Sequence, residues 1–315
     1  MPLPIWILTG PTASGKTEAA LSIAESIHAE IISADSMLVY RGMDIGTEKP
    51  AAAMQRKIPH HLIDVVDPWE EYSVGRYVKD FERVANELHQ KGKPFIVVGG
   101  TALYLKAIVD GLFEGPPADW EYRNYLKSIA AAQGPDSLHK MLAEVDAEAA
   151  HKLHFNDQRR VIRALEVIKS TGRRISSLQT QFGTKNPKYD CIMMAIEHDR
   201  AILYKRIETR VDSMLQRGLI EEVRTLVNHP MGLSRQAAQA LGYKEVIDFL
   251  GGRHTLSEVS QVIKQSTRHF AKRQMTWFRS FPGIHWIHAS AGDEPAKLSE
   301  YILAGFRQSE LLVNN

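Results

Sequence analysis

Cysteine is almost absent from this chain, which has only Cys191 among its 315 residues. One thiol cannot form an internal disulfide, and a chain of this length can bury a core large enough to fold without one. The 13 histidines are scattered, so no Cys/His cluster with zinc-site spacing is present. The sequence therefore excludes a disulfide scaffold and a structural zinc site.

Long apolar runs are also missing. The most apolar stretch, residues 95–109, is interrupted by Gly99, Gly100 and Lys106, and it falls short of the ~20 residues that cross a bilayer. Near the N-terminus only Ile5–Leu8 is apolar and no basic residue precedes it, unlike a secretory signal. We therefore expect a cytoplasmic protein that does not bind membranes.

A large excess of one charge is lacking too, because 39 basic and 37 acidic residues leave a formal net charge of +2. The distribution is uneven. Residues 151–174 contain seven basic and two acidic side chains, and residues 264–279 contain five basic and no acidic ones. Two basic segments in a nearly neutral chain favour local binding of a polyanion, although charged helix faces are often only solvated surface.

Short apolar segments alternate with helical periodicity in the first third of the chain. We predict strands at residues 5–8, 30–33, 61–66 and 94–98, and a helix at residues 18–27. A further helix is predicted where apolar residues recur at helical spacing, at Tyr77, Phe81, Val84, Ala85 and Leu88. Strands that are apolar throughout are typical of a parallel sheet covered on both faces.

The pattern changes at Gly115-Pro-Pro. Three helical patterns follow, around residues 120–129, 138–145 and 161–168, and a strand pattern returns only at residues 191–196. We therefore predict a helical insertion subdomain at residues 116–187, within a core made of residues 1–115 and 188–315.

The last third is helical again. Leu203, Ile207, Val211 and Met214 form one apolar stripe, and a second helix is predicted from Thr255 to Phe281. The latter begins with Thr-Leu-Ser-Glu, a capping-box pattern. Its spacing predicts an apolar face at Phe270, Trp277 and Phe281.

Residues 10–17, Gly-Pro-Thr-Ala-Ser-Gly-Lys-Thr, fit the whole P-loop pattern G-x-x-x-x-G-K-[ST]. The motif follows an apolar strand and opens a helix, so backbone amides and the helix N-terminus would surround phosphate oxygens. Lys16 would supply a charge, and the Thr17 hydroxyl a ligand for Mg²⁺. We predict a P-loop NTPase-like α/β fold whose phosphate site comprises Gly10, Pro11, Thr12, Ala13, Ser14, Gly15, Lys16 and Thr17.

Two further segments follow predicted strands. Asp35 closes the second strand, where ligands bind in open parallel sheets, and would act as a general base, as a partner of Mg²⁺, or only as a turn residue. Gly99-Gly100-Thr101 follows the fourth strand. Its glycines allow either close approach to a phosphate or close packing, and its hydroxyl offers a donor.

Several other residue types admit two interpretations. Arg206 and Arg210 would either reach a phosphate or form ordinary surface. His60 and His61 suggest a metal pair, but adjacent strand residues point to opposite faces, so a structural role is favoured. Cys191, in a strand, is expected in the core.

The combination of motifs resembles the bacterial tRNA dimethylallyltransferase (tRNA isopentenyltransferase) family. The resemblance covers nearly the whole chain in family order, and its segments at 33–50 and 267–279 are more specific than the P-loop alone. The matching segments are residues 10–17, 33–50, 60–64, 99–104, 156–167, 241–245 and 267–279.

The resemblance implies transfer of a dimethylallyl group from its diphosphate to N6 of the adenosine 3′ of the anticodon, in tRNAs that read codons beginning with U. It makes Asp35 the general base, places Thr101 beside the bridging oxygen of the leaving group, and assigns the diphosphate to Lys16, Thr17 and the loop amides, with Mg²⁺. From the residues themselves, we also expect Arg210 at the diphosphate. It implies tRNA contacts at Asp35, Ser36, Met37, Leu38, Thr101, Arg123, Gln158, Arg159, Arg160, Val161 and Ile162. Leu38 departs from the Gln of many members. We expect a monomer.

The chemistry agrees with those roles. An allylic group that loses diphosphate has carbocation character, so stabilising the leaving group is the main catalytic task. A carboxylate that accepts the N6 proton would assist attack. Two alternatives share the P-loop and Asp35: a transferase that prenylates free AMP or ATP, and a kinase for a small metabolite.

Overall fold

The computed structural model describes residues 2–113, 115–178, 185–290 and 293–313. The chain forms two compact units, one made of Met1–Val109 with Pro187–Asn315 and the other of Asp110–Asn186. We call them the sheet unit and the helical unit. The helical unit begins at Asp110, ahead of the Pro116 expected from the Gly-Pro-Pro signal.

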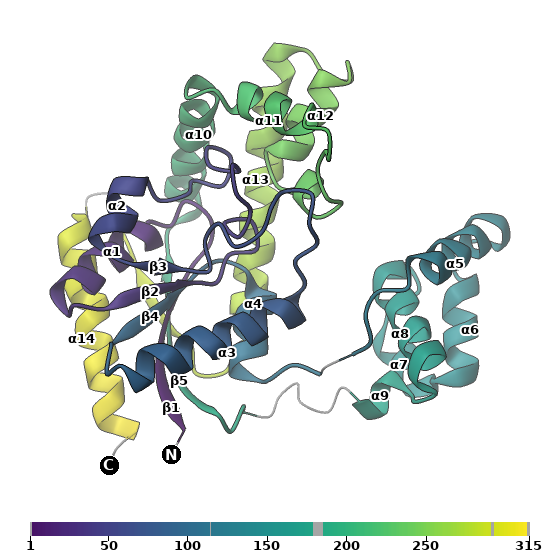
Figure 1. Ribbon diagram of the computed structural model, residues 1–315, viewed down its shortest axis with the longest axis horizontal. Coiled ribbons are helices and arrows are strands. Elements are labelled where there is room, and N and C mark those ends of the chain that lie inside the picture. The colour runs from purple at the N-terminus through teal and green to yellow at the C-terminus, as the bar shows by residue number, and fades with distance from the viewer. Residues whose placement is uncertain (1, 114, 179–184, 291–292, 314–315) are drawn as a thin grey trace. The chain divides into compact units, whose positions relative to one another are not determined.

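Six parallel strands make the sheet, in the order β3-β2-β4-β1-β5-β6 (Figure 1). Leu8 of β1 pairs with Val98 of β4, and Val98 pairs with Ser33 of β2, so these three strands end at the same level. The loops that follow them therefore meet at one edge of the sheet. The bounds are β1 (Leu3–Thr9), β2 (Glu30–Ser33), β3 (His60–His61), β4 (Phe95–Val98), β5 (Tyr189–Glu197) and β6 (His285–His288).

The third strand is much shorter than the predicted 61–66, which was wrong beyond His61. Leu62 and Asp64 have φ values of 61° and 55°, so the chain turns out of the sheet there. The backbone amides of Asp64 and Val65 instead donate to the carbonyl groups of Leu38 and Val39. The apolar run thus packs against the loop after β2. The other predicted strands are confirmed, and β6 was not anticipated.

Helices cover both faces of the sheet, as predicted. On one face, Leu8, Ile31 and Ile96 pack with residues of α1 (Lys16–Ser26) and α14 (Pro295–Val313). On the other, Ile7 and Val97 belong to a cluster with residues from six α-helices and from the 3₁₀ helix η1 (Ala237–Gln239). Those α-helices are α3 (Val74–Gln90), α4 (Ala102–Val109), α10 (Arg200–Gln216), α11 (Leu219–Val227), α12 (Tyr243–Leu250) and α13 (Leu256–Phe278). This unit also contains α2 (Ala52–Lys57).

The two helices predicted in the last third of the chain, α10 and α13, are confirmed. The apolar face predicted for α13 was wrong. The stripe of α10 is buried, and Thr255 forms the capping box with Glu258 that opens α13. In α13, Phe270 is only half-buried. The buried stripe is instead Val259, Ile263, Thr267, Ala271, Gln274 and Phe278. This stripe contains a buried glutamine, which requires hydrogen-bond partners.

The helical unit contains the three predicted helices and two short ones that the sequence did not reveal. Leu126, Leu142 and Leu165 belong to its own apolar core. Asp157 caps α8 by accepting from the Arg160 amide. The helices are α5 (Trp120–Gln133), α6 (Ser137–Val145), α7 (Ala147–Lys152), α8 (Gln158–Thr171) and α9 (Ile175–Leu178). Across the described part of the chain, no helix is long and apolar enough to cross a membrane.

Candidate active site

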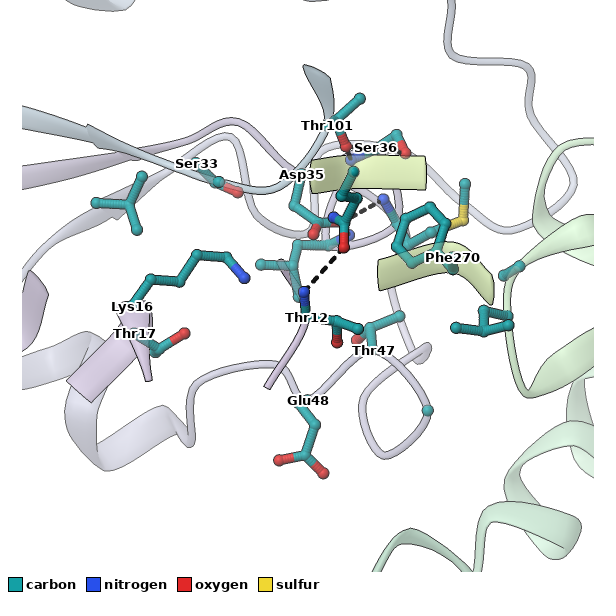
Figure 2. Close-up of a pocket in the computed structure, with 18 of the residues that line it drawn as sticks. Thr12, Lys16, Thr17, Ser33, Asp35, Ser36, Thr47, Glu48, Thr101 and Phe270 are labelled. Carbon is teal, nitrogen blue, oxygen red and sulfur yellow. Dashed lines mark hydrogen bonds between the residues drawn. The ribbon is translucent and has the colours of Figure 1, made fainter. Parts of the chain in front are cut away.

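A cavity of about 550 Å³ lies at the carboxyl ends of β1, β2 and β4 (Figure 2). The P-loop lines it together with the loops that follow β2 and β4, the loop at residues 46–50, and parts of α10, α12 and α13. The polar and charged residues in this lining include Thr12, Lys16, Thr17, Ser33, Asp35, Ser36, Thr47, Glu48, Thr101, Arg210, Lys244, Arg273 and Gln274. The strand order therefore brings together all three segments predicted to carry the chemistry.

The P-loop turns into α1 through a left-handed residue. Gly15 has φ 90° and is the N-cap of the helix, a conformation that a residue with a Cβ adopts only at a cost. Lys16 and Thr17 follow as the first residues of α1 and face the cavity. The amides of the loop and the first helical turn thus lie where a bound anion would accept from them.

Three side chains hydrogen-bond to the backbone of the P-loop and hold it in place. Arg206 Nε donates to the Ala13 carbonyl oxygen at 2.7 Å. His198 Nε2 lies 2.8 Å from the Ser14 carbonyl oxygen. Gln274 Oε1 accepts from the Thr12 amide at 2.8 Å, which removes this amide from the set available to a phosphate. Arg206 therefore holds the loop, rather than reaching into the cavity as one interpretation of the sequence had it.

Gln274 was missed by sequence reasoning. Its Nε2 also donates to the Gly100 carbonyl oxygen at 2.8 Å, so one side chain joins α13, the P-loop and the turn after β4. A signal was present, since Gln274 lies on the apolar stripe of α13 in helical register with Ala271 and Phe278. A buried amide in such a stripe predicts a specific set of partners.

Lys16 and Arg210 are the buried cations of the cavity. Burial lowers the pKa of Lys16 to about 8, with a further lowering from Arg210 that Asp35 and Glu18 oppose. Burial likewise lowers the pKa of Arg210 to about 10. Neither side chain forms an ion pair within the described ranges. Two desolvated cations without a carboxylate at ion-pair distance are arranged to bind an anion.

Asp35 and Thr101 lie on neighbouring strand ends, as predicted. Asp35 Oδ1 accepts from the Met37 amide at 2.8 Å and more weakly from the Leu38 amide at 3.4 Å. Thr101 Oγ1 accepts from the Ser36 amide at 2.9 Å and donates to Ser36 Oγ at 3.2 Å. Asp35 therefore stabilises the turn after β2 and also lines the cavity. In Figure 2 the Lys16 side chain extends toward the part of the cavity where Asp35 lies.

The glycine pair after β4 serves packing, the second of the two interpretations considered. A Cβ on Gly99 would lie 2.2 Å from the Ala34 carbonyl oxygen, and one on Gly100 would lie 2.6 Å from Gln274 Nε2. The backbones of the β2 and β4 ends touch at this point. Glycine is required there by the protein itself, before any ligand binds.

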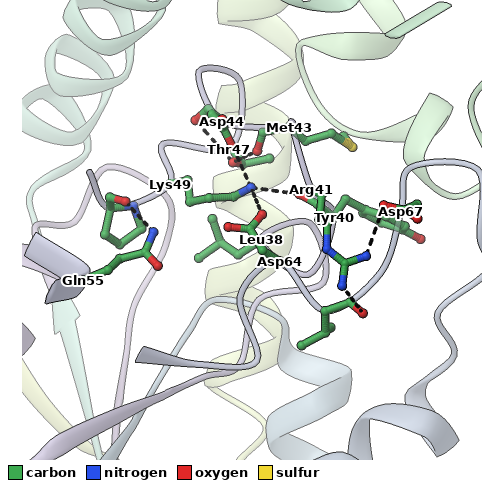
Figure 3. Close-up of polar contacts among 12 residues, drawn as sticks. Leu38, Tyr40, Arg41, Met43, Asp44, Thr47, Lys49, Gln55, Asp64 and Asp67 are labelled. Atoms are coloured by element: carbon green, nitrogen blue, oxygen red, sulfur yellow. Dashed lines mark hydrogen bonds and ion pairs between the residues drawn. The ribbon is translucent and has the colours of Figure 1, made fainter. Parts of the chain in front are cut away.

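The loop at residues 40–50 is held by charged side chains whose pairing the sequence did not reveal (Figure 3). Lys49 Nζ, almost fully buried, contacts Asp44, Asp64 and the Tyr40 carbonyl oxygen at 2.5–2.8 Å. The Glu222 carboxylate of α11 also binds this loop, because it accepts hydrogen bonds from the backbone amides of Asp44, Ile45 and Gly46 at 2.8–3.2 Å. These contacts set the position of Thr47 and Glu48 in the cavity wall.

The basic segment of α13 is partly neutralised in three dimensions. Lys264 Nζ lies 2.6 Å from Asp212, and Arg268 Nη1 lies 2.9 Å from Glu208, both acids belonging to α10. The count of five basic and no acidic residues within this segment overstated the free positive charge on α13, because the neutralising acids belong to another helix. Lys272 and Arg273 are exposed, and Arg273 reaches the cavity.

The predicted tRNA-contacting residues of the helical unit divide into two groups. Arg123 binds the buried Glu166 with Nε at 2.7 Å and Nη2 at 2.8 Å, and Arg163 Nη1 lies 2.5 Å from the same carboxylate. The side chains of Val161 and Ile162 are buried in the core of this unit, and a contact of either residue with tRNA stays a prediction. The residues left at the surface of α8 are Gln158, Arg159 and Arg160.

The residues flagged for metal chemistry have structural partners. His60 Nδ1 lies 2.6 Å from the Ile58 carbonyl oxygen and His61 Nε2 lies 2.6 Å from Glu30, so the two rings diverge as expected. Cys191 is half-buried in β5 rather than fully buried. No cluster of three His, Cys, Asp or Glu side chains is present in the described segments. A metal here would therefore need oxygens from its ligand, with Thr17 beside it.

Comparison with known proteins identifies the family. Residues 38–281 match the family model described as IPP transferase. The tRNA dimethylallyltransferase 2 of Geotalea uraniireducens (strain Rf4) is 44% identical over 281 residues, which is 89% of this chain and 91% of that protein.

Two solved structures are similar over most or all of this chain. The full-length tRNA isopentenylpyrophosphate transferase from Bacillus halodurans is 36% identical, with a TM-score of 0.72 and complete coverage of both chains. A eukaryotic dimethylallyltransferase acting on tRNA is 28% identical, with a TM-score of 0.76 over 92% of this chain and 74% of that one. The fold, the cavity and these matches agree, and the chain belongs to the IPP transferase family.

Proposed function

We propose that the protein transfers the dimethylallyl group of dimethylallyl diphosphate to N6 of the adenosine 3′ of the anticodon, in tRNAs that read codons beginning with U. The observation that carries this proposal is one cavity with unpaired Lys16 and Arg210 on one side and Asp35 beside them. Relatives named for this reaction support it.

The diphosphate would occupy the cation side of the cavity. Lys16, Arg210 and the free amides of the P-loop would neutralise it, while the Thr12 amide stays with Gln274. Mg²⁺ fits this site as a companion of the phosphates, since Thr17 faces the cavity and no carboxylate cage is present among the described residues. When bound, Mg²⁺ would add positive charge to the leaving group.

The transfer exchanges one bond for another. The adenine N6 attacks C1 of the dimethylallyl group, the C1–O bond to the diphosphate breaks, and N6 loses a proton. Asp35 would accept that proton, because its Oδ1 accepts from the Met37 amide while its Oδ2 makes no hydrogen bond within the described residues. Thr101, anchored to Ser36, would lie beside the bridging oxygen.

The RNA would approach through the open side of the cavity. The target base must leave its stack to reach a carboxylate in a cavity, and Phe270 and Arg273 lie in the wall where it would enter. The exposed Arg159 and Arg160 of the helical unit would contact phosphates of the anticodon stem. We propose a monomeric enzyme acting on tRNA in the cytoplasm.

The deciding experiment offers one donor and three acceptors. The protein is incubated with Mg²⁺ and labelled dimethylallyl diphosphate, together with an unmodified anticodon stem-loop, AMP or ATP. Label on the stem-loop alone is the expected result. Label on AMP or ATP would favour the adenylate transferase, and the absence of any label together with phosphoryl transfer from ATP would favour the kinase.

Asp35→Asn tests the base assignment. Asparagine keeps an oxygen for the Met37 amide but cannot accept the N6 proton, so we expect turnover to fall by roughly 10² to 10⁴. Stem-loop affinity should stay within a few-fold of wild type. Single-turnover kinetics with saturating RNA measure this, and near-normal turnover would contradict the role of Asp35.

A further inference from the structure

Three buried hydroxyl groups have no hydrogen-bond partner within the described parts of the chain: Ser14 Oγ, Ser33 Oγ and Tyr77 Oη. Buried polar groups are nearly always hydrogen-bonded, and each exception needs an explanation. Only one of the three, Ser33, lines the cavity. The residue is 3% exposed and its hydroxyl oxygen is itself buried, in the wall of the cavity.

The strand geometry aims Ser33 at the cation side of the cavity. Side chains alternate along a strand, and Ser33 shares a face of β2 with Ile31, which packs with α1. Lys16 and Thr17 are the first residues of α1. Figure 2 shows the Ser33 oxygen on the side of the cavity toward which the Lys16 side chain also extends.

The charges around Ser33 decide what its hydroxyl would bind. Lys16 and Arg210 offer only donors. The O–H of Ser33 needs an acceptor, and an anionic oxygen is the acceptor that the two cations also attract most strongly.

We propose that Ser33 Oγ donates a hydrogen bond to a phosphate oxygen of the diphosphate held by Lys16. The end of β2 would then contribute to binding of the leaving group together with the P-loop. This inference rests on the proposed function only in taking diphosphate as the anion. The bond would strengthen as negative charge develops on the departing group.

The test uses inorganic pyrophosphate, the full-length protein and two single-atom deletions. Ser33→Ala and Tyr77→Phe each remove one partnerless buried hydroxyl, but Tyr77 lies in the core and does not line the cavity. Titration calorimetry measures pyrophosphate affinity with and without Mg²⁺. We expect Ser33→Ala to weaken binding about tenfold in both conditions, as for a hydrogen bond to a charged group, and Tyr77→Phe to leave it unchanged.

Other outcomes overturn the proposal. Equal affinity for wild type and Ser33→Ala would show that the hydroxyl does not contact the anion. A loss seen only with Mg²⁺ would exclude direct donation to phosphate and assign Ser33 to the hydration shell of the metal. A matching loss in Tyr77→Phe would indicate a general packing effect.

Pyrophosphate binding needs no prenyl acceptor, so this test is separate from that of the proposed function. If no label reaches RNA but Ser33→Ala still weakens pyrophosphate binding, the proposed reaction fails and the Ser33 contact stands. If label reaches RNA and the Ser33→Ala affinity is unchanged, the reaction stands and the contact fails.

Discussion

The cations of the sheet unit and those of the helical unit have opposite environments. In the sheet unit, Lys16 and Arg210 are desolvated with no ion pair in the described segments, and burial lowers both of their pKa values. In the helical unit, Arg123 and Arg163 share the buried carboxylate of Glu166. All four are basic residues that the sequence analysis linked to binding of a phosphate or of RNA, Arg123 only through the family resemblance.

The difference separates cations that bind a ligand from cations that build the fold. A buried cation without a carboxylate costs free energy that only an arriving anion recovers, whereas a paired cation has already found its anion. The same distinction applies within α13, where Lys264 and Arg268 pair with acids of α10 while Arg273 reaches the cavity.

The largest expected effect comes from removing the carboxylate of the helical unit. Glu166→Gln would leave Arg123 and Arg163 without their counter-charge, and we expect a loss of about 2 to 3 kcal/mol in the stability of this unit. Hydrogen exchange of α5 and α8 amides measures it. The matched control is Glu148→Gln, which breaks an exposed pair with Lys152 and should change little. Equal protection in both variants would contradict the comparison.

Removing the charge of Lys16 in the cavity should have the opposite effect, a loss of ligand affinity without a loss of stability. Lys16→Met is expected to weaken pyrophosphate binding about 100-fold, as for the loss of charge-assisted hydrogen bonds. It should not lower the unfolding temperature of the free protein, because it removes a desolvated charge. Lys264→Met, which breaks the pair with Asp212, should lower stability and leave pyrophosphate affinity unchanged. Titration calorimetry measures the pyrophosphate affinity of both variants, and thermal unfolding measures their stability. Equal losses of affinity in the two variants would contradict the comparison.

The pH dependence of pyrophosphate binding tests whether Lys16 is a ligand-binding cation. The pKa of Lys16 is lowered to about 8, mainly by burial, so the side chain is charged below this pH and neutral above it. Bound diphosphate favours the charged form, so affinity should be full below pH 8 and should fall by up to about tenfold per pH unit above it. The Lys16→Met variant corrects for ionisation of the ligand. A parallel pH profile in that variant would refute the assignment.

The smallest effect concerns the surface of α8. Replacing both Arg159 and Arg160 by alanine should reduce the salt dependence of stem-loop binding by about two units of slope, at ~0.9 per duplex phosphate contact. Arg163 is left in place because it pairs with Glu166. Binding measured from 50 to 200 mM salt tests this. An unchanged slope would show that these two arginines face only solvent.

Local patterns predicted much of the fold. The P-loop, the capping box at Thr255 and the stripe of α10 depend on residues close together in the chain, so their spacing already specifies their geometry. The predicted third strand failed beyond His61, since its apolar run packs against the loop after β2. Periodicity shows that a segment is buried, but not which segment covers it.

By itself the sequence determined the phosphate-binding loop, the sheet covered on both faces and the helical unit, because each follows from short-range spacing and hydrophobic pattern. Only the tertiary structure decided which basic residues remain available to a ligand. Glu208 and Asp212 lie more than fifty residues before the cations they neutralise, and Gln274 lies far along the chain from the Thr12 amide it holds. Charge pairing and hydrogen bonding depend on distance in space, and folding sets that distance.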